Sequence, residues 1–334
     1  MNQELEEHSF KLNVKQKLAN ALAFLFVLTI VLPFLMILIS DVSSALVGYG
    51  SLLEICKRIY WYFLSSVINF PLFLLALVSI FVLQNMYPVL KSQRNFNRAL
   101  VVDLIYFAVM LIFYMAVASK FFLYLKSFFS IPELTLWETN LSSINYFWQL
   151  LIGYLAVDFL GWFHHLVRHK VPFFWAMHSV HHSQKELNPF SNERVHFLDW
   201  FVANIIKFSP ALFFTESLGI ILNYIIIHKF LDHLNHANIK TNLGPFRYIF
   251  VTPQSHRVHH SSEKEFFDKN FGVSLSIWDH LFGTQCKNYD AYPATGVPDK
   301  TFPNEQDGTE HNVLSAFVKQ QIYPFKKMIQ YLRE

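Results

Sequence analysis

The chain has 334 residues, a length that allows one large domain or two small ones. Hydrophobic residues make up 53% of it, aromatic residues 17% and charged residues only 15%, a composition typical of a membrane protein. The net charge of +3 and the lack of a basic run argue against a nucleic-acid partner. The two cysteines, Cys56 and Cys286, exclude a disulfide framework, and no P-loop, GxGxxG or CxxC motif provides an electron carrier within the chain.

Four apolar stretches are long enough to predict transmembrane helices, at residues 18–40, 60–83, 100–118 and 145–163. The loop between the second and third stretches carries Lys91, Arg94 and Arg98 but no acid, which marks it as cytoplasmic. Four crossings from a cytoplasmic N-terminus place the residues after 163 on the same side. Asp103 lies near the start of the third stretch, where we expect it at the membrane interface rather than in a functional site.

A fifth apolar run extends from Leu198 to Phe230 and is interrupted by Pro210 and Gly219. Two full spans need about 40 residues, and this run has only 33. It is therefore predicted to be a re-entrant hairpin that enters the membrane and returns. A single tilted span would instead separate the histidines before the run from those after it by the bilayer.

Histidines dominate the second half of the chain, where fifteen of the sixteen lie between residues 164 and 311. His165 and His169 are four residues apart, so they share one face of a helix. Two HxxHH motifs, beginning at His178 and His256, also place their histidines on single helical faces. Imidazole is a ligand of iron, zinc and copper, and the absence of a cysteine cluster argues against structural zinc or an iron–sulfur centre. The spacing therefore predicts a site for a pair of transition-metal ions.

From Asp158 to Thr284 the sequence resembles the fatty acid hydroxylase or sterol desaturase superfamily of membrane di-iron enzymes. HxxxH, HxxHH and HxxHH boxes follow one another in the family's order, and Asp158 stands seven residues before His165. Family-like segments surround the last box, namely Asn242–Pro245, Thr252–Pro253, Asn270–Gly272, Trp278–Asp279 and Phe282–Thr284. This run is most similar to the bacterial sterol-desaturase-like and alkylglycerol monooxygenase branches.

The resemblance implies two iron ions held by the eight histidines of the boxes and by one more upstream of the last box. This set is His165, His169, His178, His181, His182, His236, His256, His259 and His260. No catalytic residue beyond these ligands is implied.

Three residues stay open as further or alternative ligands. His164 and His169 have the HxxxxH spacing of fatty acid 2-hydroxylases, although the position of Asp158 favours His165 as the first ligand. Some family members carry a histidine where this chain has Asp232, with His233 beside it. Asp158 is expected to orient a ligand ring from behind, and so is His196, which also matches a recurrent family position.

The resemblance also implies an activity, namely hydroxylation or desaturation of a lipid with dioxygen and external electrons. The lipid would be a sterol, a fatty acyl chain or an alkylglycerol ether arriving from the bilayer. The external electron donor would be a cytochrome b5-like protein, a ferredoxin or a tetrahydropterin. The alternative is a histidine-rich membrane protein that binds zinc without redox chemistry. A zinc hydrolase would want an HExxH-like glutamate, which is absent, and a transporter would place its histidines inside the spans.

We therefore expect an all-α integral membrane protein with about four transmembrane helices, a re-entrant hairpin and a histidine-rich di-metal helical domain on the cytoplasmic side. The expected divisions are a membrane region at 1–144, a catalytic domain at 145–284 and a soluble C-terminal tail at 285–334.

Overall fold

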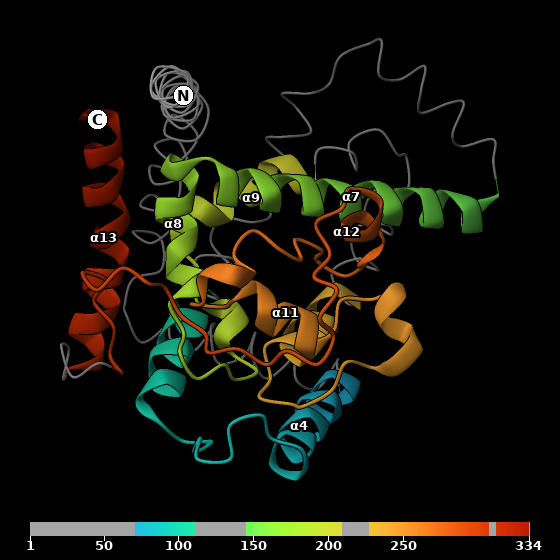
Figure 1. The fold of residues 1–334 in the computed structure, drawn as a ribbon, viewed down its shortest axis with the longest axis horizontal. Helices are drawn as coiled ribbons and strands as arrows, with labels where there is room; N and C mark the ends of the chain where they lie inside the picture. The colour runs from blue at the N-terminus through green and yellow to red at the C-terminus, as the bar shows by residue number, and fades with distance from the viewer. Residues whose placement is uncertain (1–70, 111–144, 209–226, 307–311, 334) are drawn as a thin grey trace, which may run out of the picture.

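The computed structural model describes residues 71–110, 145–208, 227–306 and 312–333, and these residues form helices joined by loops (Figure 1). Within these ranges β-structure is limited to isolated bridges, so the all-α prediction is confirmed for them. The longer helices are α4 (Pro71–Met86), α7 (Tyr146–Lys170), α8 (Pro172–His182), α9 (Phe197–Phe208) and α13 (Val313–Arg333), with further helical residues at 98–110 and 227–235. The short ones are η2 (Ser191–Glu193), η4 (Gly244–Tyr248), α11 (Pro253–His259), η5 (Lys264–Phe266) and α12 (Ile277–Leu281).

Helix α7 is the one helix of the described residues that is long and apolar enough to cross a membrane, judged by length and composition. Asn145 caps its start, where its side chain accepts a hydrogen bond from the backbone N–H of Phe147 at 2.9 Å. Its first turns expose Phe147 and Trp148, whereas its last turns are mostly buried and carry the first histidines. The predicted span at 145–163 thus continues as one helix into the histidine motif.

The other predicted spans fall wholly or partly outside the described residues. Residues 18–40 lie outside them, α4 covers only the second half of the 60–83 stretch, and the helix at 98–110 covers only the start of the 100–118 stretch. The middle of the predicted hairpin also lies outside, while its two described ends are helical. The number of crossings and the side of the membrane stay predictions.

Helix α8 turns sharply away from the end of α7, and α13 runs beside it (Figure 1). Pro172 occupies the first turn of α8, where its missing N–H costs no hydrogen bond. A hydrophobic cluster joins α8, α13 and the helix at 98–110 through Val180, Tyr323 and Tyr106. Residues after 284, predicted to be a soluble tail, therefore supply part of the packing around the histidine helix.

A fully buried ion-pair network lies beside this cluster. The Arg194 side chain donates from Nε to Asp103 Oδ1 and from Nη2 to Glu305 Oε1, each at 2.7 Å, and none of the three side chains is exposed. Burial alone would lower the pKa of Arg194, but the two carboxylates outweigh burial and raise it. Arg194 is therefore charged. Asp103 is fully buried and its carboxylate balances an arginine 91 residues further along the chain, while its expected position at a membrane interface stays a prediction.

Removing one member of this network should destabilise the fold. We expect Asp103→Ala to lower the free energy of unfolding by about 3–5 kcal/mol, because Arg194 keeps its charge and loses one of its two carboxylates. The measurement is the apparent melting temperature of the purified protein. The control is Lys170→Gln, which removes a surface pair with Asp268 whose side chains are 50% and 44% exposed and should cost less than about 1 kcal/mol. Equal shifts for both variants would contradict this prediction.

Candidate metal centre

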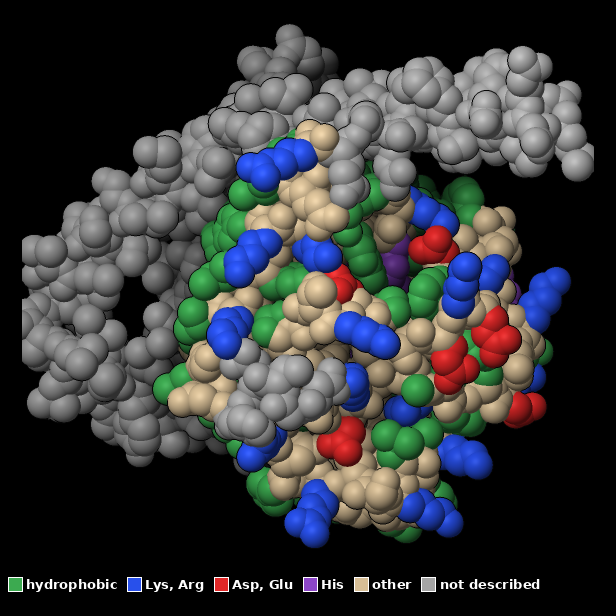
Figure 2. All heavy atoms as spheres, turned by 60° about the vertical axis from the view of Figure 1, so that its left-hand side comes forward, with side chains coloured by type: hydrophobic (Ala, Val, Ile, Leu, Met, Phe, Trp, Pro, Cys, Tyr) green, Lys and Arg blue, Asp and Glu red, His purple; other side chains and the backbone are tan. Residues whose placement is uncertain are grey.

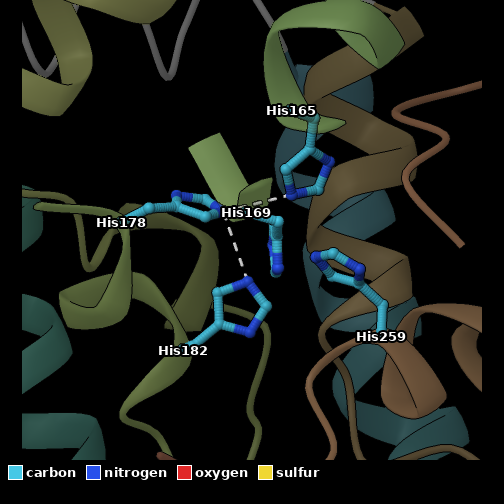
Figure 3. A group of neighbouring side chains, drawn as sticks. All are labelled: His165, His169, His178, His182 and His259. Carbon is cyan, nitrogen blue, oxygen red and sulfur yellow. Dashed lines mark hydrogen bonds between the residues drawn. The ribbon is translucent and has the colours of Figure 1, made fainter. Parts of the chain in front are cut away.

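The nine predicted ligands come together in two adjoining groups in the interior of the domain. The first group, drawn in Figure 3, consists of His165, His169, His178, His182 and His259, and the second consists of His181, His236, His256 and His260. In each group one nitrogen of every ring lies within 4.8 Å of the corresponding nitrogens of the others. The groups meet where the rings of His182 and His260 stack with 4.2 Å between their centroids.

Each HxxHH motif divides its histidines between the two groups. On α8, His178 and His182 face the first group, while His181 faces the second. On α11, His259 joins the first group, and His256 joins the second together with His260, which caps the helix. A helix with the HxxHH spacing therefore lies between two sites and serves both, which is a physical reason for the repeated motif.

In the first group, hydrogen bonds behind the rings fix which nitrogen carries the proton. His165 Nδ1 lies 2.9 Å from the carbonyl oxygen of Phe271, and His178 Nδ1 lies 3.0 Å from Asp199 Oδ2. Carbonyl and carboxylate oxygens only accept, so each Nδ1 carries the proton and each Nε2 presents a lone pair. These two Nε2 atoms face each other at 3.1 Å.

The second group follows the same rule at its centre. His236 Nδ1 donates to the backbone oxygen of Asp232 at 2.8 Å, which leaves Nε2 of this ring without a proton. That Nε2 lies 2.9 Å from His256 Nε2 and 3.3 Å from His181 Nε2. His260 Nε2 in turn lies 3.1 Å from His256 Nε2. Four ring nitrogens thus converge on one small volume.

These contacts fit metal ions better than they fit hydrogen bonds. Two facing lone pairs repel one another unless a cation lies between them. Two imidazole nitrogens bound at right angles to one ion, with bonds of about 2.1 Å, would be about 3.0 Å apart, close to the spacing of His165 and His178. Two more buried ring nitrogens, Nε2 of His169 and Nε2 of His259, have no hydrogen-bond partner among the described residues.

Burial also keeps the rings neutral, as metal ligation requires. It lowers the pKa of the α8 and α11 histidines, namely His178, His181, His182, His256, His259 and His260. The pKa reaches about 3 for His181 and for His259. At neutral pH these side chains therefore carry no charge and can offer a lone pair.

The residues left open as further ligands lie outside both groups. His164 turns its Nδ1 toward the backbone oxygen of Gly161 in the preceding turn of its own helix. His233 turns its Nδ1 toward the backbone oxygen of Pro189 at 2.6 Å. Asp232 lies behind a ring, with its carboxylate 3.3 Å from Nδ1 of His236. Asp232 therefore supports the ring of His236 from the side away from the group's centre.

The two residues expected to orient ligand rings have other partners in the structure. Asp158 accepts hydrogen bonds from the backbone N–H groups of Ser274 and Leu275 and from Trp278 Nε1, so it holds a loop rather than a ring. His196 donates from Nε2 to the backbone oxygen of Gln321 in α13 at 3.1 Å, so it fastens α9 to α13. Both expectations of direct contact with a ligand are therefore wrong.

Two other aspartates support the ligand rings, Asp199, which was not predicted, and Asp279, which was named only as part of the family-like Trp278–Asp279 segment. Asp199 binds His178 and also accepts from Arg168 Nη1 at 2.8 Å. Asp279 accepts from the backbone N–H groups of Phe271 and Gly272 at 2.8 and 2.7 Å, which fixes the carbonyl that holds His165. The available signal for Asp199 was an acid in the first turn of an apolar run.

The described part of the chain thus contains a helical domain with two adjoining groups of buried imidazoles. Residues 150–284 of the chain match the family model described as fatty acid hydroxylase. The resemblance stated from the motifs is confirmed by this match.

Curated relatives carry the same domain. The human alkylglycerol monooxygenase is 35% identical over 138 residues, which cover 41% of this chain and 30% of that protein. An ornithine lipid hydroxylase of Rhizobium tropici is 29% identical over 164 residues, covering 47% of this chain and 50% of the relative. A very-long-chain aldehyde decarbonylase of Oryza sativa subsp. indica is 27% identical over 171 residues, covering 47% and 26%. The match thus spans half or less of each relative's length. No solved structure matches the chain.

The contact between Asp199 and His178 leads to a prediction about metal affinity. We expect Asp199→Asn to weaken metal binding about 10- to 100-fold, because the amide loses the charge that steadies the ring and pairs with Arg168. Metal retained by the purified protein against graded chelator concentrations measures the change. The control is Asp268→Asn on the surface, which should retain as much metal as the unchanged protein. Identical retention by both variants would remove Asp199 from this role.

Proposed function

We propose that this protein is a membrane di-iron oxygenase that hydroxylates or desaturates a lipid with dioxygen and external electrons. The observation that carries the proposal is the pair of adjoining groups, five imidazoles in one and four in the other, buried or nearly buried. The fatty acid hydroxylase match over residues 150–284 supports it. A histidine-only ligand set also agrees with the preference of imidazole for iron and similar metals.

Each group of histidines would hold one iron ion. When bound, the pair of ions would supply the redox chemistry needed to attack an unactivated C–H bond with dioxygen. The chain's own contribution is to hold the rings in one tautomer and one orientation before any metal arrives. Each of four oxygens accepts a hydrogen bond from the Nδ1–H of one ligand ring. They belong to the Asp199 carboxylate and to the backbone of Phe271, Lys269 and Asp232.

The interior position of the site is the second contribution of the chain. Eight of the nine rings come from helices or their caps that pack tightly around them, and all are largely shielded from solvent. Phe271 is fully buried and lies against the rings of His165 and His169, with centroid separations of 6.0 and 5.2 Å. Such a wall keeps water from competing with an apolar substrate.

The substrate would be a lipid with a polar headgroup that enters from the bilayer. The relatives' names point to alkylglycerols and ornithine lipids, and both are apolar chains joined to a polar head. Helix α7 connects an exposed apolar start, including Phe147 and Trp148, with the two ligands near its end. Because moving a long hydrocarbon chain through water is costly, lateral entry along such a helix is the favoured route.

The electrons would come from a separate donor on the cytoplasmic face. The sequence contains no motif for a flavin, a haem or an iron–sulfur cluster, and each turnover consumes two electrons. A cytochrome b5-like protein, a ferredoxin or a tetrahydropterin would each serve.

A ligand substitution tests the site. We expect His181→Ala to abolish product formation and to reduce bound metal, because its ring belongs to the second group and its Nε2 lies 3.3 Å from the Nε2 of His236. The protein should still insert into membranes. The matched control is His280→Ala, an exposed histidine outside both groups, which should keep its activity. Near-normal turnover by His181→Ala would exclude this residue as a ligand.

Metal content and electron dependence test the chemistry. Protein produced with iron available is expected to contain two iron ions per chain and to form product from a candidate lipid only when dioxygen and a reductant are both supplied. Metal analysis together with product detection in lipid vesicles measures this. One zinc ion and no iron would favour the zinc-binding alternative. Product without any added reductant would contradict the requirement for a donor.

A further inference from the structure

Helix α13 carries an exposed apolar stripe along its whole length. The stripe consists of Leu314, Val318, Ile322, Phe325, Ile329 and Leu332, whose side chains are between 39% and 61% exposed. At about 100° per residue these six positions fall within an arc of about 80°. The opposite side of the helix is buried and includes Ala316, Gln320 and Tyr323. The helix therefore has two apolar faces, and only one of them is covered by the described part of the chain.

The charges of α13 all have one sign. The helix contains Lys319, Lys326, Lys327 and Arg333 and no acid. Three of these cations, Lys319, Lys326 and Arg333, are exposed on one flank of the apolar stripe, and Lys327 pairs with Asp299 at 2.6 Å. The side of the molecule on which α13 lies shows Lys and Arg side chains beside hydrophobic ones (Figure 2).

This pattern fits the surface of a membrane. An exposed apolar residue is ordinary by itself, but six on one unbroken stripe form the apolar face of an amphipathic helix. Lysines near the middle of α13 exclude it as a span, while a helix of low overall hydrophobicity with cations beside its apolar face suits the headgroup layer. An acidic protein would satisfy the cations, but a protein interface usually adds polar contacts that this stripe does not offer.

We propose that α13 lies in the headgroup layer of a membrane that contains anionic lipids, with the stripe toward the acyl chains and the flanking cations among the headgroups. The buried side of α13 would transmit that position to the histidine helix. Tyr323 packs on Phe302 with 4.7 Å between the ring centroids, and both belong to the cluster that contains Val180 of α8. Val180 stands between two ligands of α8, so α13 would set the height of the metal centre above the bilayer. The inference does not depend on the chemistry proposed above.

The experiment uses the full chain with Cys56→Ser and Cys286→Ser, carrying one new cysteine labelled with an environment-sensitive dye. One variant is Ile322→Cys in the stripe, and the control is Gln330→Cys, which is exposed outside the stripe on the same helix. Each is reconstituted in phosphatidylcholine vesicles with and without phosphatidylserine. Emission and quenching are then measured with a quencher attached to the lipid acyl chains and with aqueous iodide.

At position 322 we expect blue-shifted emission and loss of most of the intensity to the lipid-borne quencher, whereas position 330 should respond mainly to iodide. Strong iodide quenching at 322 would overturn the proposal. Protection of 322 from both quenchers would also overturn it, because another part of the chain, a second copy or an acidic protein would then cover the stripe.

The role of the cations is tested by Lys319→Gln, Lys326→Gln and Arg333→Gln combined in the Ile322→Cys background. The unchanged helix should show stronger lipid quenching when phosphatidylserine is present, and the combined variant should lose this difference. A difference that persists in the variant would refute the preference for anionic lipids. None of these readouts requires metal or turnover, so failure of the proposed enzyme activity would leave the result interpretable.

Discussion

The structure depends on one electrostatic constraint, which is that unprotonated ring nitrogens point toward each other in a dry interior. The Nδ1 protons of His165, His178 and His236 are all directed outward to groups that can only accept. Their Nε2 lone pairs must therefore face inward, where the nearest neighbours are other imidazole nitrogens. Such an arrangement is unfavourable without cations, so the surrounding fold has to hold it in place. The supporting aspartates and loops can be understood as the means of doing so.

Buried charges fix the framework on both sides of the histidine helix. On one side Arg194 is held between two carboxylates that come from distant parts of the chain, and Ser183 at the end of α8 also accepts from its Nη1 at 3.3 Å. On the other side Asp279 accepts hydrogen bonds from the backbone N–H groups of the loop whose carbonyl orients His165. An added Cβ at Gly272 would lie 2.7 Å from the backbone oxygen of Leu275, so this loop can close only around a glycine. Buried networks of this kind add little net stability, and their main effect is to specify one geometry of the surrounding helices and loops.

The sequence could predict what local spacing controls, and little of what distant contacts control. Helical spacing alone grouped the histidines of the three boxes, whereas His236 was accessible only through the family resemblance. The division of each HxxHH motif between two groups depends on how α8 and α11 face one another, which spacing does not specify. The burial of Asp103 against Arg194 was not predicted, because hydropathy carries no information about a partner 91 residues away. Asp158 and His196 were assigned to ligand rings through the family resemblance, whereas Asp158 binds a loop and His196 binds the neighbouring helix α13.

The two longest described helices impose a joint condition on where the metal centre can lie. Helix α8 contacts both α7 and α13 and supplies three of the nine rings, so both helices determine its position. With the start of α7 in the bilayer and α13 in the headgroup layer, the ligands of α8 would lie near the membrane surface. A lipid could then present a carbon of its chain to the site while most of its apolar surface stays out of water, which removes the main cost of substrate capture. The amphipathic C-terminal helix would thus act as a spacer between the membrane and the chemistry, a role that the description of residues 285–334 as a soluble tail would not explain.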